Sequence, residues 1–164
     1  MSDYTGKNIF EKIGSFIPGY NGYSEKEGRR DNDKSLRLEI ARHLDRLKED
    51  INNIIRQQMD EKKMDLINDL DKMKRNLDIA ANQVRYATYG ESGFFDIIQV
   101  DTSDLDRLYQ YDLEIKEAIE KIALKIASLQ SSDNLKKDSS SIIGLLSDVG
   151  QKMANRNEVI MEVK

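Results

Sequence analysis

Few residues in this sequence are of the types that do catalytic or metal chemistry. His43 is the only histidine, and it follows Glu39 by four residues, beside an apolar seam rather than on it. Metal centres in helical bundles need several Glu-x-x-His pairs from different helices, so we expect His43 to be a partly exposed helix-surface residue. The chain has no cysteine, no Gly-x-x-x-x-Gly-Lys phosphate loop, no dinucleotide fingerprint and no nucleophile elbow. We therefore predict no enzymatic activity, no catalytic or metal-ligating residues and no cofactor.

Two charged residues occupy positions where helical periodicity calls for apolar side chains. Asp112 interrupts a seam of leucines and isoleucines, and Arg156 interrupts another nearer the C-terminus. A buried charge must be paired, because leaving it alone costs several kcal/mol. We expect Asp112 to pair with Arg156 or with Arg85, which fixes helix register as buried polar residues do in coiled coils. A ligand site inside the bundle is the alternative interpretation.

The N-terminal third contains sequence motifs that a plain helical bundle does not require. An apolar face over residues 8–17 is followed by a Pro-Gly stop, two tyrosines and a row of cations at i, i+4 and i+8. The neighbouring row of Glu25, Arg29, Asp33 and Arg37 alternates in sign and is expected to pair within the helix. We predict a partner-contact segment made of Pro18, Gly19, Tyr20, Gly22, Tyr23, Lys26, Arg29, Arg30 and Lys34.

The same segment allows two other interpretations. We favour the interpretation in which residues 8–17 fold back on the bundle and the tyrosines cover its end, because isolated short helices are marginal until they pack. Alternatively, the segment could bind an anionic membrane surface, with Ile9, Phe10, Ile13 and Phe16 inserted into lipid.

A second aromatic group follows the second long helical pattern. Tyr86, Tyr89, Phe94 and Phe95 flank a Gly-Glu-Ser-Gly turn, and we predict a further contact corner there. The only strand-like run, residues 94–100, is expected to be a connector that plugs the end of the bundle. Residues 89–120 carry nine acidic and two basic side chains, which could meet a basic partner or a basic row on another copy.

The elements that must position these residues are long amphipathic helices. A capping box predicts that the first begins near Ser24. Apolar residues at alternating steps of four and three predict four seams, and a turn is favoured at residues 60–63 because the first two seams are out of phase. Ser139–Ser141 are expected to precede the last helix. The seams are Ile40–Ile54, Leu66–Ala87, Leu105–Leu129 and Ile142–Ile160.

Composition agrees with this architecture. The 164 residues are 34% charged and 38% hydrophobic, with one proline, which is typical of helices with one apolar stripe. A net charge of −4 argues against general nucleic-acid binding. The N-terminus lacks the pattern of a signal peptide, and no apolar run is long enough for a transmembrane helix. We expect an all-α, up-down four-helix bundle over residues 24–164, preceded by an amphipathic helix and connector over 1–23.

Several segments resemble a family of small, uncharacterised bacterial all-helical proteins. They are residues 17–34 (IPGYNGYSEKEGRRDNDK), 84–96 (VRYATYGESGFFD) and 104–109 (DLDRLY), and the likeness extends to about Leu129. The resemblance implies a cytoplasmic bacterial bundle without catalytic residues. Relatives more often carry an aromatic residue where Glu91 stands, so an aromatic contact is not carried over there. The charged helical hairpins are also similar in style to phage-shock-type membrane-stress proteins.

These observations predict a non-enzymatic interaction or scaffolding module in the cytoplasm. We expect a protein partner or self-association and no nucleic acid. A peripheral membrane-surface protein at the inner face of the membrane is the alternative.

Overall fold

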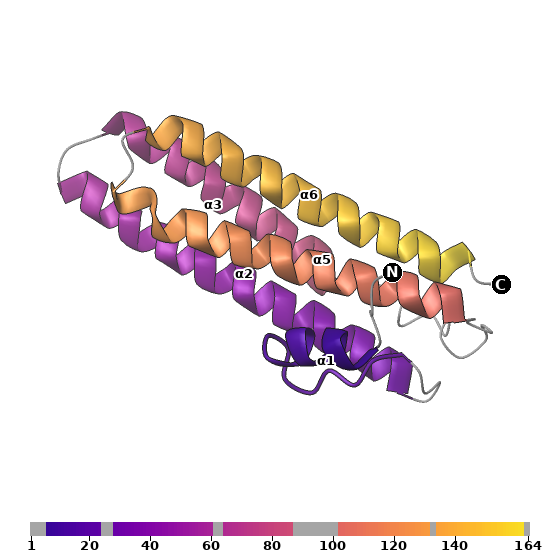
Figure 1. Ribbon diagram of the computed structural model, residues 1–164. Coiled ribbons are helices and arrows are strands. Elements are labelled where there is room, and N and C mark those ends of the chain that lie inside the picture. Colours follow the sequence, from indigo (N-terminus) through magenta and orange to yellow (C-terminus); the bar gives the residue numbers. More distant parts are fainter. Residues whose placement is uncertain (1–5, 24–27, 61–63, 87–101, 132–133, 163–164) are drawn as a thin grey trace.

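The computed structural model describes residues 6–23, 28–60, 64–86, 102–131 and 134–162. Its elements are α1 (Gly6–Gly14), α2 (Arg29–Asp60), α3 (Met64–Arg85), α5 (Thr102–Ala127), a 3₁₀ turn η3 (Leu129–Ser131) and α6 (Leu135–Glu162). The protein is all-α: four long helices form the bundle, and the short α1 lies against it (Figure 1). None of the described helices is both long and apolar enough to span a membrane.

The first two long helices form a hairpin, as predicted. α2 ends at Asp60, α3 begins at Met64, and the two pack along their lengths. Lys48 of α2 bridges Asp78 of α3 at 3.1 Å. α2 begins at Arg29, directly after Gly28, which lies in a 3₁₀ turn. The capping box expected at residues 24–27 lies outside the described residues.

α5 and α6 form the second hairpin, with one boundary that differs from the prediction. α6 begins at Leu135, so Ser139 lies inside the helix rather than before it. The reason is a better cap: Asn134 Oδ1 accepts a hydrogen bond from the Lys137 backbone N–H at 3.1 Å. Ser139 is buried, and its hydroxyl donates to the Asp69 carbonyl of α3 at 3.3 Å.

Each hairpin helix also packs against the other hairpin. α2 contacts α5 and α3 contacts α6. Consecutive long helices run in opposite directions, so these cross-hairpin neighbours are parallel (Figure 1). At one end of the bundle α2 and α5 end and α3 and α6 begin. We call the opposite end, where α2 and α5 begin and α3 and α6 end, the open end.

The predicted seams form the core. Leu66 and Leu105 are only half-buried, and Ala87 and the Ile160 side chain lie outside the described set. Ile9, Ile13 and Ile17 of the N-terminal segment belong to the same core. The buried seam residues are Ile40, Leu44, Leu47, Ile51 and Ile54 on α2; Leu70, Met73, Leu77, Ala80 and Val84 on α3; Leu108, Ile115, Ile119, Ile122 and Ile126 on α5, with Leu129 just beyond it; and Ile142, Leu146, Val149 and Met153 on α6.

Candidate functional site

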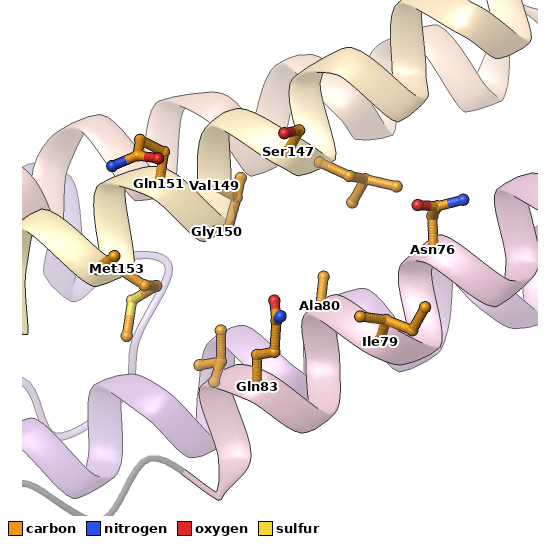
Figure 2. Close-up of a pocket in the computed structure, with 12 residues that line it drawn as sticks. Asn76, Ile79, Ala80, Gln83, Ser147, Val149, Gly150, Gln151 and Met153 are labelled. Carbon is orange, nitrogen blue, oxygen red and sulfur yellow. The ribbon is translucent and has the colours of Figure 1, made fainter.

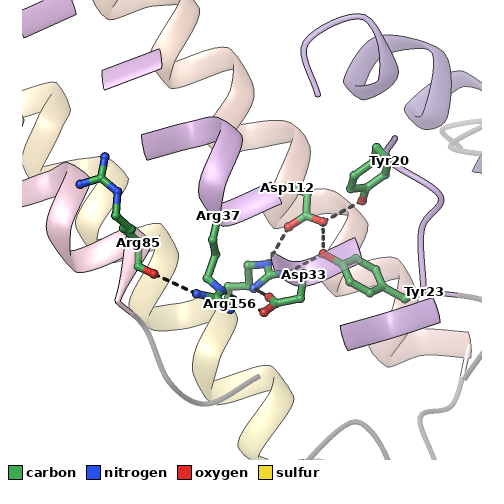
Figure 3. Close-up of polar contacts among 7 residues, drawn as sticks. All are labelled: Tyr20, Tyr23, Asp33, Arg37, Arg85, Asp112 and Arg156. Atoms are coloured by element: carbon green, nitrogen blue, oxygen red, sulfur yellow. Dashed lines mark hydrogen bonds and ion pairs between the residues drawn. The ribbon is translucent and has the colours of Figure 1, made fainter. Parts of the chain in front are cut away.

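Asp112 and Arg156 meet at the centre of a polar cluster near the open end of the bundle. Both side chains are fully inaccessible to solvent, and Arg156 Nε lies 2.6 Å from Asp112 Oδ1. Arg156 Nη1 also contacts Asp33 Oδ1 of α2 at 2.6 Å. The structure thus brings together the two charged residues that interrupt apolar seams. It also shows that Asp33 of α2 belongs to the same cluster (Figure 3).

Two tyrosines from the connector between α1 and α2 complete the coordination of Asp112. Tyr20 and Tyr23 donate their hydroxyl protons to the same carboxylate oxygen, at 2.7 and 2.6 Å. The Tyr23 hydroxyl also accepts a hydrogen bond from Arg156 Nη2. Its backbone N–H donates to the Tyr109 hydroxyl at 2.8 Å, so the connector is bound through side chain and backbone alike.

A second arginine brings the third helix into the cluster. Arg37 Nε bridges Asp33 Oδ2 at 3.0 Å, and Arg37 Nη1 donates to the Arg85 carbonyl at the end of α3 at 3.2 Å. Figure 3 shows that the Arg85 side chain points away from the cluster. Its guanidinium pairs with Asp45 instead, so Arg85 is not the partner of Asp112. Asp33, Asp112, Arg37 and Arg156 balance in charge, which permits their joint burial.

Burial also controls the protonation of the cluster. Desolvation raises the pKa of Asp112 above its ordinary value of 3.8, while Arg156 and the two hydroxyl donors act in the opposite direction. Burial, followed by the nearby Asp112 carboxylate, raises the pKa of Tyr20 far above its usual range. Burial likewise raises the pKa of Tyr23, so both hydroxyls remain protonated donors at physiological pH.

The chemistry open to this cluster is therefore structural. A carboxylate and phenols of raised pKa are groups that acid–base catalysis uses, but such catalysis requires hydrogen-bond contact with a substrate. Asp33, Asp112 and Arg156 have no solvent-accessible surface, so no substrate reaches them in this conformation. Instead, the cluster ties the connector to α2, α5 and α6, and through Arg37 to α3.

Of the seven residues of the predicted partner-contact segment whose side chains the structure describes, four are buried and three are exposed. Tyr20, Tyr23 and Arg29 are buried, and Arg29 Nε donates to the Tyr23 carbonyl at 2.6 Å. Their hydroxyl and guanidinium groups find partners in the core, which is the physical reason that this part of the surface prediction is wrong. Pro18, Gly19 and Lys34 are exposed, whereas Gly22 is buried. Lys26 and the side chain of Arg30 lie outside the described residues.

The apolar face of the N-terminal segment also turns inward. α1 ends at Gly14, and the Ile17 N–H continues its turn by donating to the Ile13 carbonyl at 2.8 Å. The rings of Phe16 and His43 stack with centroids 3.9 Å apart, and a His43 ring nitrogen lies 3.3 Å from the Phe16 carbonyl. His43 is half-buried, as expected, and it helps to hold the segment on α2.

The second predicted contact corner is described only in part. Tyr86 is 70% exposed at the end of α3, with the Arg85 guanidinium 5.9 Å from its ring centroid. Tyr89, Phe94 and Phe95 lie outside the described residues, as do the strand-like run and the first part of the acidic segment. Among the described residues, no group of three or more acidic, histidine or cysteine side chains is placed to hold a metal ion.

A surface feature that sequence reasoning missed is a groove of about 430 Å³ between the parallel helices α3 and α6 (Figure 2). None of its twelve lining residues is charged, although charged residues make up a third of the chain. Ile79 stands at the groove and is 56% exposed. The lining consists of Asn76, Ile79, Ala80, Gln83, Val84, Leu146, Ser147, Val149, Gly150, Gln151, Met153 and Ala154.

Comparisons of the chain with protein-family models, with curated proteins and with solved structures found no match.

Proposed function

We propose that the protein is a non-enzymatic helical interaction module that binds an amphipathic helix of a protein partner in the α3/α6 groove. The observation that carries the proposal is the uncharged lining of this groove, in a chain so rich in charge. Depletion of charged residues is the compositional mark of interface cores. A solvated helix face in this protein would instead carry the Lys, Asp and Glu found elsewhere.

The chemistry of the groove restricts the partner. Five of the eight lining residues without a polar side-chain atom belong to the core and are almost fully buried, so the apolar surface open to a partner comes from Ile79, Gly150 and Ala154. The partner helix would place apolar side chains against these three residues. Asn76, Gln83 and Gln151 add amide donors and acceptors. A charged group on the inserted face of the partner would be buried without an opposite charge, which disfavours binding.

The sealed polar cluster supports a module without catalysis or cofactor, because its ionisable groups serve the fold. The expected cytoplasmic location belongs to this proposal. The membrane alternative would require α1 to leave the bundle and expose Ile9, Ile13 and Ile17. Co-sedimentation with anionic vesicles separates the two: we expect the full chain to stay in solution, and efficient pelleting would favour the membrane alternative.

Site-specific photo-crosslinking tests the groove directly. A photoreactive amino acid replaces Ile79 at the groove, and a matched variant carries it at Leu124, which is 73% exposed on α5. We expect position 79 alone to crosslink, within cells, to one discrete helical segment. Ser147→Arg, which places a charged side chain in the groove at an exposed position, should abolish that product. Equal yields from positions 79 and 124 would reject the proposal.

A further inference from the structure

The methionines that the structure describes fall into two classes of exposure. The chain has no cysteine, so its six methionines supply all of its sulfur. Met73 and Met153 belong to the core, with 0% and 6% of their surface exposed. Met59 and Met64 are 55% and 63% exposed. Two of the described thioethers are therefore open to reagents in the solvent, and two are shielded from them.

The two exposed methionines flank the connection between the first pair of long helices. Met59 is the last residue but one of α2, and Met64 is the first residue of α3, at the end of the bundle where α2 ends and α3 begins (Figure 1). Of the side chains that the structure describes, Ile54 is the last buried one before the connection and Ile67 the first after it. Met64 also precedes Asn76, the first groove residue of α3, by about 18 Å of helix. The methionine pair thus lies outside both the core and the groove.

An exposed thioether reacts with a two-electron oxidant such as hydrogen peroxide. A sulfur lone pair attacks one peroxide oxygen, an S–O bond forms as the O–O bond breaks, and proton transfer converts the departing hydroxide into water. Sulfur loses two electrons and peroxide gains them, so the products are methionine sulfoxide and water. Methionine sulfoxide reductases return the sulfoxide to the thioether.

The position of a methionine decides what its oxidation does to the fold. A sulfoxide is polar, so it disrupts a core in which a thioether packs. The sulfur of a core methionine meets peroxide only when the surrounding structure opens. Met59 and Met64 lie in solvent already, so their oxidation leaves the packing of the bundle intact.

We infer that Met59 and Met64 form a reversible oxidation site, at which peroxide converts two exposed apolar side chains into polar ones while the bundle stays folded. The inference depends on the placement of the described methionines: the exposed ones share one connection, and the others are sealed in the core. It does not rest on the proposed function, because the site lies apart from the groove.

Timed oxidation of the full chain by hydrogen peroxide tests the site. Peptide mapping by mass spectrometry follows each methionine separately, including Met1 and Met161, whose side chains lie outside the described residues. We expect the exposed pair to reach half-oxidation at least about tenfold sooner than the two core methionines, because the core must open before it reacts. Equal rates for the exposed and core methionines would overturn the inference.

The melting temperature of the oxidised chain provides a second readout. After selective oxidation of the pair, we expect it to change by no more than about 2 °C, as for most surface substitutions. The matched control is the Met59→Leu/Met64→Leu double variant, which lacks both thioethers and passes through the same treatment. A larger decrease in the natural chain, absent from the double variant, would contradict the placement of the pair outside the packed core.

Cells that produce the full chain show whether the modification is reversible there. Protein synthesis is blocked, a pulse of hydrogen peroxide is given, and the sulfoxide at both positions is followed by peptide mapping. We expect the sulfoxide to rise during the pulse and to return to its untreated level after the peroxide is removed. Failure of the sulfoxide to form, or to disappear afterwards, would overturn the assignment of a reversible site.

Discussion

Replacing Arg156 by methionine removes the cation at the centre of the buried cluster. The substitution keeps a long side chain but leaves Asp33 and Asp112 without the guanidinium that contacts each at 2.6 Å. Removing one partner of a buried ion pair costs about 3–5 kcal/mol, because the remaining charge stays desolvated. For a protein of this size, that loss corresponds to a decrease in melting temperature of roughly 6–20 °C.

Urea unfolding followed by circular dichroism at two pH values measures this effect and identifies its origin. The pKa of Asp112 is already raised by burial, and loss of Arg156 raises it further. Protonation therefore favours the folded variant, so the stability deficit should be largest above the raised pKa. We expect a smaller deficit at about pH 4.5 than at about pH 7.5.

Arg42→Met is the matched control. Arg42 also bridges an acid, Glu39, at 3.1 Å, but its side chain is 65% exposed, and such surface pairs contribute at most about 1 kcal/mol. The reasoning would be refuted if Arg156→Met cost no more than Arg42→Met at neutral pH. A deficit that did not change with pH would refute the assignment of the cost to unpaired carboxylate.

Further predictions concern the connector and its acceptor. Tyr20→Phe should lower the free energy of unfolding by about 1.5–3 kcal/mol, and Tyr23→Phe by more because its hydroxyl also accepts from the guanidinium; equal, negligible losses in urea unfolding would contradict this. The Asp112→Asn side chain cannot ionise. As the pH rises from about 4 to 7, the free energy of unfolding of this variant should therefore fall less than that of the natural chain, in which the raised pKa of Asp112 favours folding at low pH. Gly19→Ala should cost about 1 kcal/mol, because φ is +83° although a methyl group has space, while Gly14→Ala should be neutral or stabilising; equal melting temperatures would show that the backbone conformation does not matter.

The helices and the central pair could be predicted because both follow from periodicity. Steps of four and three placed the seams, and interruption of a seam identified Asp112 and Arg156. Asp33 and Arg37 carried the same signal, since continuing the α2 seam backwards from Ile40 passes through both. Their alternating charges suggested pairing within one helix, and that pair does form, but in the core.

The other features of the site could not be predicted, because they depend on contacts between residues that are far apart in the sequence or on the order of the helices around the bundle. Tyr20 finds its acceptor 92 residues away, so its aromatic motif was equally compatible with a surface. The groove depends on α3 and α6 being neighbours, an order around the bundle that seams alone do not specify. The start of α6 could not be predicted either, because Ser139–Ser141 are as suitable for an N-cap as Asn134, which is the residue that caps the helix.

The long sequence separations in the cluster have a consequence for the order of folding. Each hairpin can form through local contacts, but Arg156 reaches Asp33 across 123 residues and Tyr23 across 133. Contacts of such separation require closure of most of the chain and are expected to form late, after the rate-limiting barrier. Interactions absent from that transition state slow unfolding without accelerating folding. We therefore expect substitutions in the cluster to raise the unfolding rate while leaving the folding rate nearly unchanged.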